Sequence, residues 1–193
     1  MLKIDYVVNS FFNSMTWIHS IMESNQVWLV DCGDSKPIIE YIKNYNLTLR
    51  GIFLTHTHFD HIYGLNDLLV EYPDLTVYTS EYGKLCLFSD KMNLSCYHES
   101  SFIYKGDNVN ILHEGDSVKL SNENYINIIE TPGHCPSCLT YYTDNEIFTG
   151  DSYIPGIKVV TKLPKGNKAI AVDSTNKILN LSTNRKIYPG HQN

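Results

Sequence analysis

The residues from His56 to His61 follow the pattern His-x-His-x-Asp-His, which packs three imidazoles and one carboxylate into six consecutive positions. Neutral imidazole and carboxylate groups are the ligands that Zn²⁺ and similar ions take in catalytic sites. Side chains two positions apart in an extended segment share a side. We therefore expect His56 and His58 to face one way, with Asp60 beyond them and His61 facing a second centre. The stretch predicts a metal site rather than a run of surface histidines.

The size and composition of the chain predict an ordinary globular domain. The chain has 193 residues, enough for a sizeable core, and we expect residues 1–193 to form a single domain. Its hydrophobic content of 42% and charged content of 19% are typical of a folded protein. The net charge of −6 argues against a broad phosphate-binding surface, so we expect no nucleic-acid partner.

The sequence also bears on the compartment. The N-terminal residues contain no apolar run of signal-peptide length, and eighteen apolar residues never follow one another. We therefore expect a cytoplasmic protein with no membrane partner. The five cysteines are an odd number without framework spacing, which favours free thiols in a reducing compartment. The oligomeric state stays open.

Hydrophobic periodicity divides the chain into strands and helices. Strands are expected at 3–8, 14–19, 26–31, 49–54, 75–78, 117–120, 126–130, 137–143, 147–149 and 186–188, and helices at 36–45, 62–72, 80–88 and 169–181. Residues 90–114 read as irregular with a strand or two, and residues 152–168 as a long polar loop. Strand runs flanked by helices in both halves predict an α/β fold of two sheets face to face with helices outside, a four-layer αββα sandwich.

Three further turns resemble the end of the strand that precedes His56. Each is a strand ending in a small-residue turn with one candidate ligand: Thr131-Pro132-Gly133-His134, Phe148-Thr149-Gly150-Asp151 and Tyr188-Pro189-Gly190-His191. Glycine permits the sharp turn that aims the next side chain inward. Together with the first motif, in this order and at these separations, the turns resemble the metallo-β-lactamase superfamily over nearly the whole chain.

The resemblance implies a site for two metal ions at the sheet edges. His56, His58 and His134 would hold the first ion, Asp60, His61 and His191 the second, and Asp151 would bridge the two. Asp60 is in addition the one candidate catalytic side chain. The implied cofactors are two divalent ions, zinc first, with iron or manganese as alternatives.

The resemblance also implies a reaction. A hydroxide held between the two ions would attack a thioester, lactone or related acyl carbon in a small-molecule substrate, with an anionic substrate among the alternatives, while one ion polarises the substrate oxygen. Gly150-Asp151 is similar to the hydrolase branch that includes glyoxalase II and lactonases rather than to true β-lactamases. Glyoxalase II continues past its last histidine into a glutathione-binding helical region, but here only Gln192 and Asn193 follow His191, so we do not expect that glutathione contact.

Two other chemistries stay open. Persulfide dioxygenases are similar in fold and use a single iron, for which His56, His58 or its equivalent, His134 and Asp151 are candidate ligands. Ribonuclease or phosphodiesterase chemistry is less favoured, because the chain is acidic and has no recognisable RNA-binding appendage.

Several residues lie outside the predicted ligand set. Cys135 and Cys138 are interpreted as buried thiols, with a site-lining, oxidisable Cys135 as the alternative. A basic group in the loop 152–168 is interpreted as solvated, or as one or two contacts to a substrate carboxylate or phosphate. Tyr153 is a further candidate for contacting substrate. The remaining histidines are expected to be ordinary hydrogen-bonded or exposed side chains. The basic group comprises Lys158, Lys162, Lys165 and Lys168, and the remaining histidines are His19, His98 and His113.

Overall fold

The computed structural model describes residues 2–21 and 24–192. Its strands are β1 (Leu2–Val8), β2 (Met15–Ile21), β3 (Gln26–Val30), β4 (Thr48–Phe53), β5 (Val77–Thr79), β6 (Val109–Ile111), β7 (Ser117–Lys119), β8 (Tyr125–Glu130), β9 (Leu139–Tyr142), β10 (Glu146–Gly150) and β11 (Lys186–Pro189). Its helices are α1 (Ser35–Asn44), α2 (Leu65–Glu71), α3 (Glu81–Leu87) and α4 (Lys168–Ser182), with short 3₁₀ turns η1 (Phe59–His61) and η2 (Ser95–Tyr97).

The described strands form two sheets. One has the order β1-β2-β3-β4-β5-β6, and the other has the order β11-β10-β9-β8-β7. Strands β1 to β3 pair antiparallel, and β7 to β10 form a second antiparallel meander, as the sequence predicted. Strands β3 to β6 run parallel, and α4 carries the chain from β10 to the parallel strand β11.

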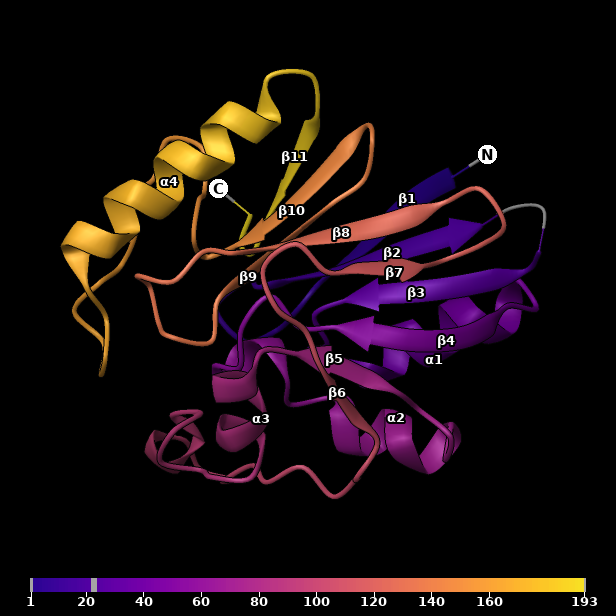
Figure 1. Cartoon of the computed structure of the whole chain (residues 1–193). Coiled ribbons are helices and arrows are strands. Elements are labelled where there is room, and N and C mark those ends of the chain that lie inside the picture. Colours follow the sequence, from indigo (N-terminus) through magenta and orange to yellow (C-terminus); the bar gives the residue numbers. More distant parts are fainter. Residues whose placement is uncertain (1, 22–23, 193) are drawn as a thin grey trace.

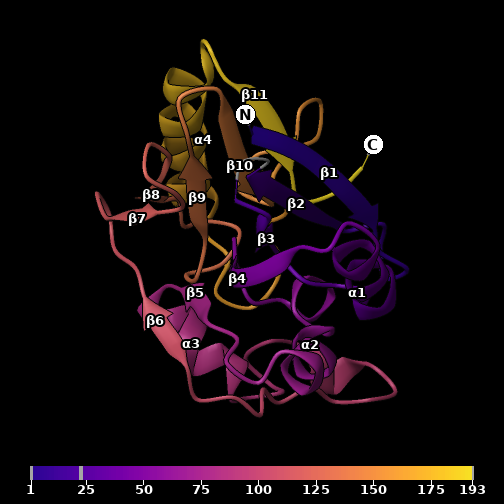
Figure 2. The ribbon, with the colours of Figure 1, turned by 90° about the vertical axis from the view of Figure 1, so that its right-hand side faces the viewer.

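The layers follow from which residues pack together. One apolar cluster lies between the first sheet and α1 to α3, a second lies between the two sheets, and a third joins β8 and β10 to α4. Figures 1 and 2 show α4 beside β10 and β11, with α1, α2 and α3 gathered beyond the other sheet. The predicted four-layer αββα sandwich is therefore confirmed.

Strand β3 shows how the sequence specifies these layers. Val27 and Leu29 belong to the cluster under the helices, whereas Trp28 and Val30 belong to the cluster between the sheets. All four side chains are buried, because a strand covered on both faces must be apolar on both. The same alternation places Ile128 between the sheets and Ile129 against α4.

Local deviations from the expected elements are small. The helix expected from residue 62 begins at Leu65, and the strand expected from residue 137 begins at Leu139. Ser80 caps α3 as expected, accepting a hydrogen bond from the backbone N–H of Gly83 at 3.0 Å. Within the irregular segment 90–114, the structure forms η2 and β6.

The expectation for His19 was wrong. This side chain on β2 is fully buried, and neither ring nitrogen has a hydrogen-bond partner among the described residues. It lies at a ring-centroid distance of 6.0 Å from Phe148 of the opposite sheet. The alternation of side chains along β2 places His19 in the layer between the sheets, beside Trp17 and Ile21. The sequence around His19 mixes polar and apolar residues, so it does not show that this histidine is buried.

None of the described helices is long and apolar enough to cross a lipid bilayer.

Candidate metal centre

The candidate ligands all follow strand ends on one edge of the sandwich. Strand β4 ends at Phe53, and the next residues deliver the first motif, with Asp60 and His61 in η1. His134 follows β8, Asp151 follows β10 directly, and His191 follows β11. Strand ends hold such side chains rigidly, so residues distant in sequence can share one site.

The structure brings all seven candidate ligands together. Atoms able to bind a metal ion lie within 4.8 Å of one another in three groups: His56, His58 and His134; His56, His61 and Asp151; and Asp60, His61 and His191. The first and third groups match the two sets that the resemblance implied. The second group is an addition, since it joins them through His56, His61 and Asp151. His61 belongs to the third group, as expected for the second centre, and also to the group that joins the two.

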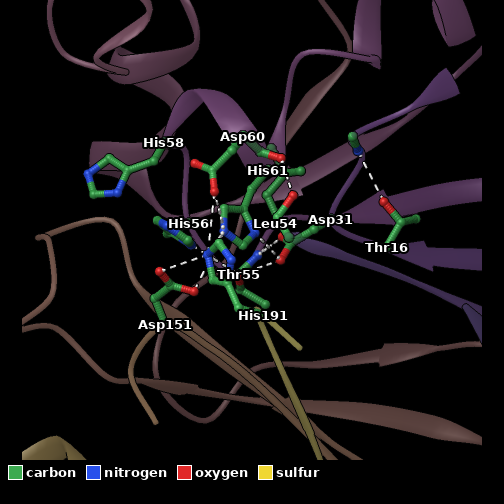
Figure 3. A network of polar contacts seen from close by, with 12 residues as sticks. Thr16, Asp31, Leu54, Thr55, His56, His58, Asp60, His61, Asp151 and His191 are labelled. Carbon is green, nitrogen blue, oxygen red and sulfur yellow. Dashed lines mark hydrogen bonds and ion pairs between the residues drawn. The ribbon is translucent and has the colours of Figure 1, made fainter. Parts of the chain in front are cut away.

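The polar contacts are densest around His191. Its Nε2 lies 3.3 Å from an Asp151 carboxylate oxygen, 3.4 Å from an Asp60 oxygen and 3.3 Å from Nε2 of His61. Figure 3 shows the carboxylates of Asp60 and Asp151 directed toward these imidazoles. On the other side of the cluster, Nε2 of His134 lies 2.9 Å from Nδ1 of His58 and 3.6 Å from Asp151.

Two buried atoms in this cluster show that its residues fit a cation. Nε2 of His56 and Oδ1 of Asp151 are buried without a hydrogen-bond partner among the described residues. Burying a polar atom without a partner is costly unless a ligand satisfies it. An imidazole nitrogen and a carboxylate oxygen are the donors that zinc, iron and manganese accept.

Hydrogen bonds outside the cluster orient three of the imidazoles. The Nδ1–H of His134 donates to the carbonyl of Val160 at 2.8 Å, and that of His191 donates to the carbonyl of Phe12 at 3.0 Å. The Nδ1–H of His61 donates to Asp31 at 3.0 Å. Each bond fixes the tautomer that leaves the Nε2 lone pair directed into the cluster, as metal-binding histidines require.

The imidazole pKa values differ within the cluster. Burial, with His61 nearby, lowers the pKa of His56 well below its ordinary value, and burial with His134 lowers the pKa of His58 to about 3. Burial also opposes a charge on His61, but Asp60 and Asp31 outweigh it and raise its pKa well above the ordinary value. His56 and His58 are therefore neutral, with lone pairs free, and a bound cation would displace the proton of His61.

The two carboxylates of the cluster are ionised. Burial favours the protonated acid of Asp151, but the hydrogen bond to His191 and the nearby imidazoles hold its pKa well below the ordinary value. For Asp60, burial acts in the same sense and is outweighed by His61, so its pKa is lowered as well. Two anionic carboxylates among imidazoles form a donor set suited to divalent cations.

Glycines make the turns that deliver the ligands. Gly133 and Gly150 have φ angles of 134° and 49°, in the region that favours glycine. Gly190 packs so closely that an added Cβ would lie 2.2 Å from Oδ1 of Asp151. The expectation that these glycines allow sharp turns is confirmed, and Gly190 in addition leaves room for the Asp151 carboxylate.

Sequence reasoning missed the groups that hold the ligands in place. Asp31, fully buried with φ of 62°, accepts hydrogen bonds from both the backbone and the hydroxyl of Thr55 at 2.7 Å, besides that from His61. The hydroxyl of Ser14 donates to the carbonyl of Asp60 at 2.7 Å. The Asp31-Cys32-Gly33 turn is visible in the sequence and could have indicated Asp31. No sequence feature marks the backbone carbonyls that hold His134 and His191.

The cysteines and Tyr153 lie close to, but outside, the ligand groups. Cys135 and Cys138 are free and buried, with their sulfurs 3.2 Å apart, which confirms their interpretation as buried thiols. Tyr153 is half-buried in the apolar cluster against α4, so its contact with substrate stays a prediction. Of the basic residues in loop 152–168, Lys165 lines a cavity beside His58, whereas Lys158 lines a groove along α4.

The αββα sandwich and the His/Asp cluster at its strand ends define a class of metal-dependent enzymes. The chain matches the metallo-beta-lactamase superfamily over residues 12–191 and belongs to it. Members of this superfamily bind divalent metals, and the described clusters could hold them.

Curated relatives of the chain include hydroxyacylglutathione hydrolases. The protein of that name from Pseudoalteromonas translucida (strain TAC 125) is 29% identical over 185 residues, covering 96% of this chain and 63% of the relative. Another, from Hahella chejuensis (strain KCTC 2396), is 29% identical over 174 residues, 88% of this chain and 58% of the relative. The chain thus spans about three-fifths of the length of these relatives.

Solved structures share the fold. The BLEG-1 B3 metallo-beta-lactamase aligns with a TM-score of 0.90 at 22% identity, covering 99% of this chain and 92% of that one. TTHA1623 in a di-iron-bound form aligns with a TM-score of 0.80 at 25% identity, covering 98% and 92%. ETHE1 from Myxococcus xanthus aligns with a TM-score of 0.76 at 22% identity, covering 99% and 76%.

Proposed function

We propose that the chain is a dinuclear metal-dependent hydrolase of thioesters, lactones or related acyl compounds. The observation that carries the proposal is the overlap of the ligand groups: His56, His61 and Asp151 form a group of their own and join the two outer groups. That overlap supports two adjacent cation positions. When bound, a pair of divalent cations supplies a water whose pKa is near neutrality and polarises the substrate oxygen.

The side chains of the cluster have different roles in holding the cations. His56 and His58 stay neutral and present free nitrogen lone pairs, while Asp60 and Asp151 supply negative charge. The layer of Asp31 and backbone carbonyls behind them holds the imidazoles in one orientation. Such preorganisation supports hydrolysis without a nucleophile from the protein.

The comparisons support acyl transfer to water. The curated relatives are named hydroxyacylglutathione hydrolases, which places thioesters first among the substrates to try. The solved structure described as di-iron-bound, at 25% identity, supports a two-metal site on this fold. We thus propose both the substrate class of this chain and the divalent nature of its ions.

Elemental analysis of the purified protein, followed by assays on thioester, lactone and phosphodiester panels, tests the proposal. We expect about two divalent ions per chain and turnover of at least one thioester or lactone, lost on chelation and restored by added metal. A single iron per chain, with sulfite formed from glutathione persulfide, would instead establish the iron oxygenase alternative. Turnover of phosphodiesters alone would also overturn the proposal.

A further inference from the structure

A cavity of about 190 Å³ opens beside the candidate metal centre, on the side of His58. His58 and Thr57 contribute to its wall, together with Cys135 from the turn after His134. Tyr82 from α3 forms another part of the wall. The cavity therefore adjoins the first ligand group directly, and a substrate reacting at the centre could extend an arm into it.

Two lysines from separate loops line this cavity. Lys91 comes from the segment after α3, and Lys165 comes from the loop before α4. Both are exposed, and neither forms an ion pair with any of the described residues, whereas Lys3, Lys43 and Lys177 do. No aspartate or glutamate lines the cavity, although the chain as a whole has a net charge of −6.

The rest of the lining includes apolar surface. Met92, Pro136 and Pro164 contribute carbon surface, which suits a short methylene chain better than a free inorganic ion. Two unpaired ammonium groups then suit a carboxylate on that chain, because a charge-assisted hydrogen bond is stronger than a neutral one. The combination favours an arm of a few carbon atoms that ends in a negative charge.

We propose that this cavity binds a carboxylate-bearing arm of the substrate, and that Lys91 and Lys165 select it. The inference rests on the proposed hydrolase function and names the substrate class: acyl compounds with a carboxylate a few carbons from the reacting bond. The carboxylate belongs either to the acyl group or to the leaving group, since both extend from that bond.

The other cavities near the cluster lack this combination. The groove of about 230 Å³ along α4 has Lys158 and Lys168 in its lining, but none of the seven candidate ligands. The hollow of about 320 Å³ beside His191 is lined by Tyr6, Trp17 and proline rings, and no lysine or arginine contributes to it. Of these three cavities, the one beside His58 joins a candidate ligand to lysines.

Matched pairs of synthetic thioesters test the inference. One pair carries the charge in the acyl group: the glutaryl and glutaramoyl thioesters of N-acetylcysteamine. The other pair carries it in the leaving group: the acetyl thioesters of 3-mercaptopropionate and of its amide. Within each pair only the charge differs, so the ratio of kcat/KM for acid over amide measures carboxylate selection.

The variant Lys91→Met/Lys165→Met removes both charges and keeps the side-chain length. We expect the acid-over-amide ratio to exceed one for one pair and to fall about tenfold or more in this variant. The exposed Lys119 on β7 provides the matched control Lys119→Met, in which the ratio should stay at its original value. The pair that responds identifies the arm that carries the carboxylate.

The outcomes distinguish a failure of the cavity proposal from a failure of the proposed hydrolase function. If the protein hydrolyses the amides but shows no preference for either acid, or if the preference survives in the double variant, the cavity does not select a carboxylate although the hydrolase function stands. If none of these thioesters is hydrolysed and the lactone panel shows no turnover either, the proposed function fails, and calorimetric titration with glutarate decides the cavity. Binding about tenfold weaker in the double variant than in Lys119→Met supports the cavity, and equal binding overturns it.

Discussion

Asp151 shows at the scale of one residue what the cluster requires. Its carboxylate lies near three imidazoles, and its buried Oδ1 has no hydrogen-bond partner among the described residues. We predict that Asp151→Asn, which keeps the shape and removes the charge, loses one or both metal ions and lowers turnover by more than about a hundredfold. Elemental analysis and steady-state kinetics measure the two effects.

Folding must be checked in the same variant. Circular dichroism and a thermal melt of the metal-free proteins should show that Asp151→Asn is folded, because the uncharged amide relieves the burial of an anion. Unchanged metal content together with unchanged turnover would refute a bridging role for Asp151.

Asp31 permits a second prediction, since among the described residues His61 is the one candidate ligand that it contacts directly. We expect Asp31→Asn to weaken binding of one cation by about 10–100-fold, because the tautomer and orientation of His61 are no longer fixed. The matched control is Asp34→Asn in the same turn, which accepts hydrogen bonds from Ser10 and Tyr63 but does not contact His61. Competition with a chelator of known affinity measures both variants, and equal affinities would exclude a positioning role.

Residue types explain how much of the site could be predicted. Histidine and aspartate after a glycine turn are visible in a sequence, so all seven candidate ligands were predicted, and the structure places them in one cluster. Their binding of metal stays a prediction. The carbonyls of Phe12 and Val160 could not be predicted, because every residue has a carbonyl group and only the fold decides which one faces an imidazole.

At the scale of elements, the turn after β11 is the sharpest test. An added Cβ at Gly190 would lie 2.2 Å from Oδ1 of Asp151, which can rotate away, and 2.8 Å from the backbone carbonyl carbon of Gly150, so the turn must shift slightly as well. We predict that Gly190→Ala folds but binds metal at least about tenfold more weakly, because the carboxylate is displaced. Isothermal titration with Zn²⁺ and a thermal melt distinguish loss of metal from loss of fold.

Gly115 supplies the control for that variant. It has a φ of 85° and open space around it, so Gly115→Ala strains the backbone without touching the cluster. We expect this variant to lose about 1 kcal/mol of stability and to keep its zinc affinity. If Gly190→Ala keeps its affinity too, the close approach of Gly190 does not position Asp151.

Long-range contacts account for the elements whose limits were predicted wrongly. The expected helix from residue 62 starts late because the backbone groups of His61 and Gly64 bond to Cys32 at 2.8 and 3.2 Å. The strand expected from residue 137 is likewise shortened, since the Ser137 carbonyl accepts from Ser80. Periodicity reports on local preference and cannot show a partner as far away as Ser80 is from Ser137, 57 positions.

At the scale of the whole molecule, the layers were predictable and the strand order was not. Two antiparallel meanders with helices around them indicate two covered sheets. The neighbours of β5 and β6 depend instead on parallel pairings between segments of three residues each, which leave almost no pattern in the sequence.

The buried His19, in the layer between the sheets, makes the stability of the fold depend on pH. Burial lowers its pKa to about 4 in the folded state, against about 6.5 when unfolded, so the unfolded chain binds the proton first as pH falls. Stability from this residue is complete above pH 6.5 and decreases as the pH falls toward 4. We predict that His19→Leu removes that decrease, on the order of 3 kcal/mol across this interval.

Chemical denaturation at several pH values, with a chelator present throughout, measures the difference between the parent protein and His19→Leu. The metal centre titrates alike in both, so it cancels in the comparison. The exposed His113 gives the control His113→Leu, which removes a surface imidazole instead of a buried one. A pH-independent difference between the parent and His19→Leu would show that His19 takes up its proton without unfolding.

The carbonyl of Phe12, near one end of the chain, holds the imidazole of His191, near the other. During synthesis on the ribosome, the hairpin that carries this carbonyl emerges long before its partner does. A nascent chain can therefore gather His56, His58 and His134 while Asp151 and His191 are still inside the exit tunnel. We expect the protein to acquire its full complement of ions only after His191 has left the tunnel, which makes maturation sensitive to the cellular supply of metal at that moment.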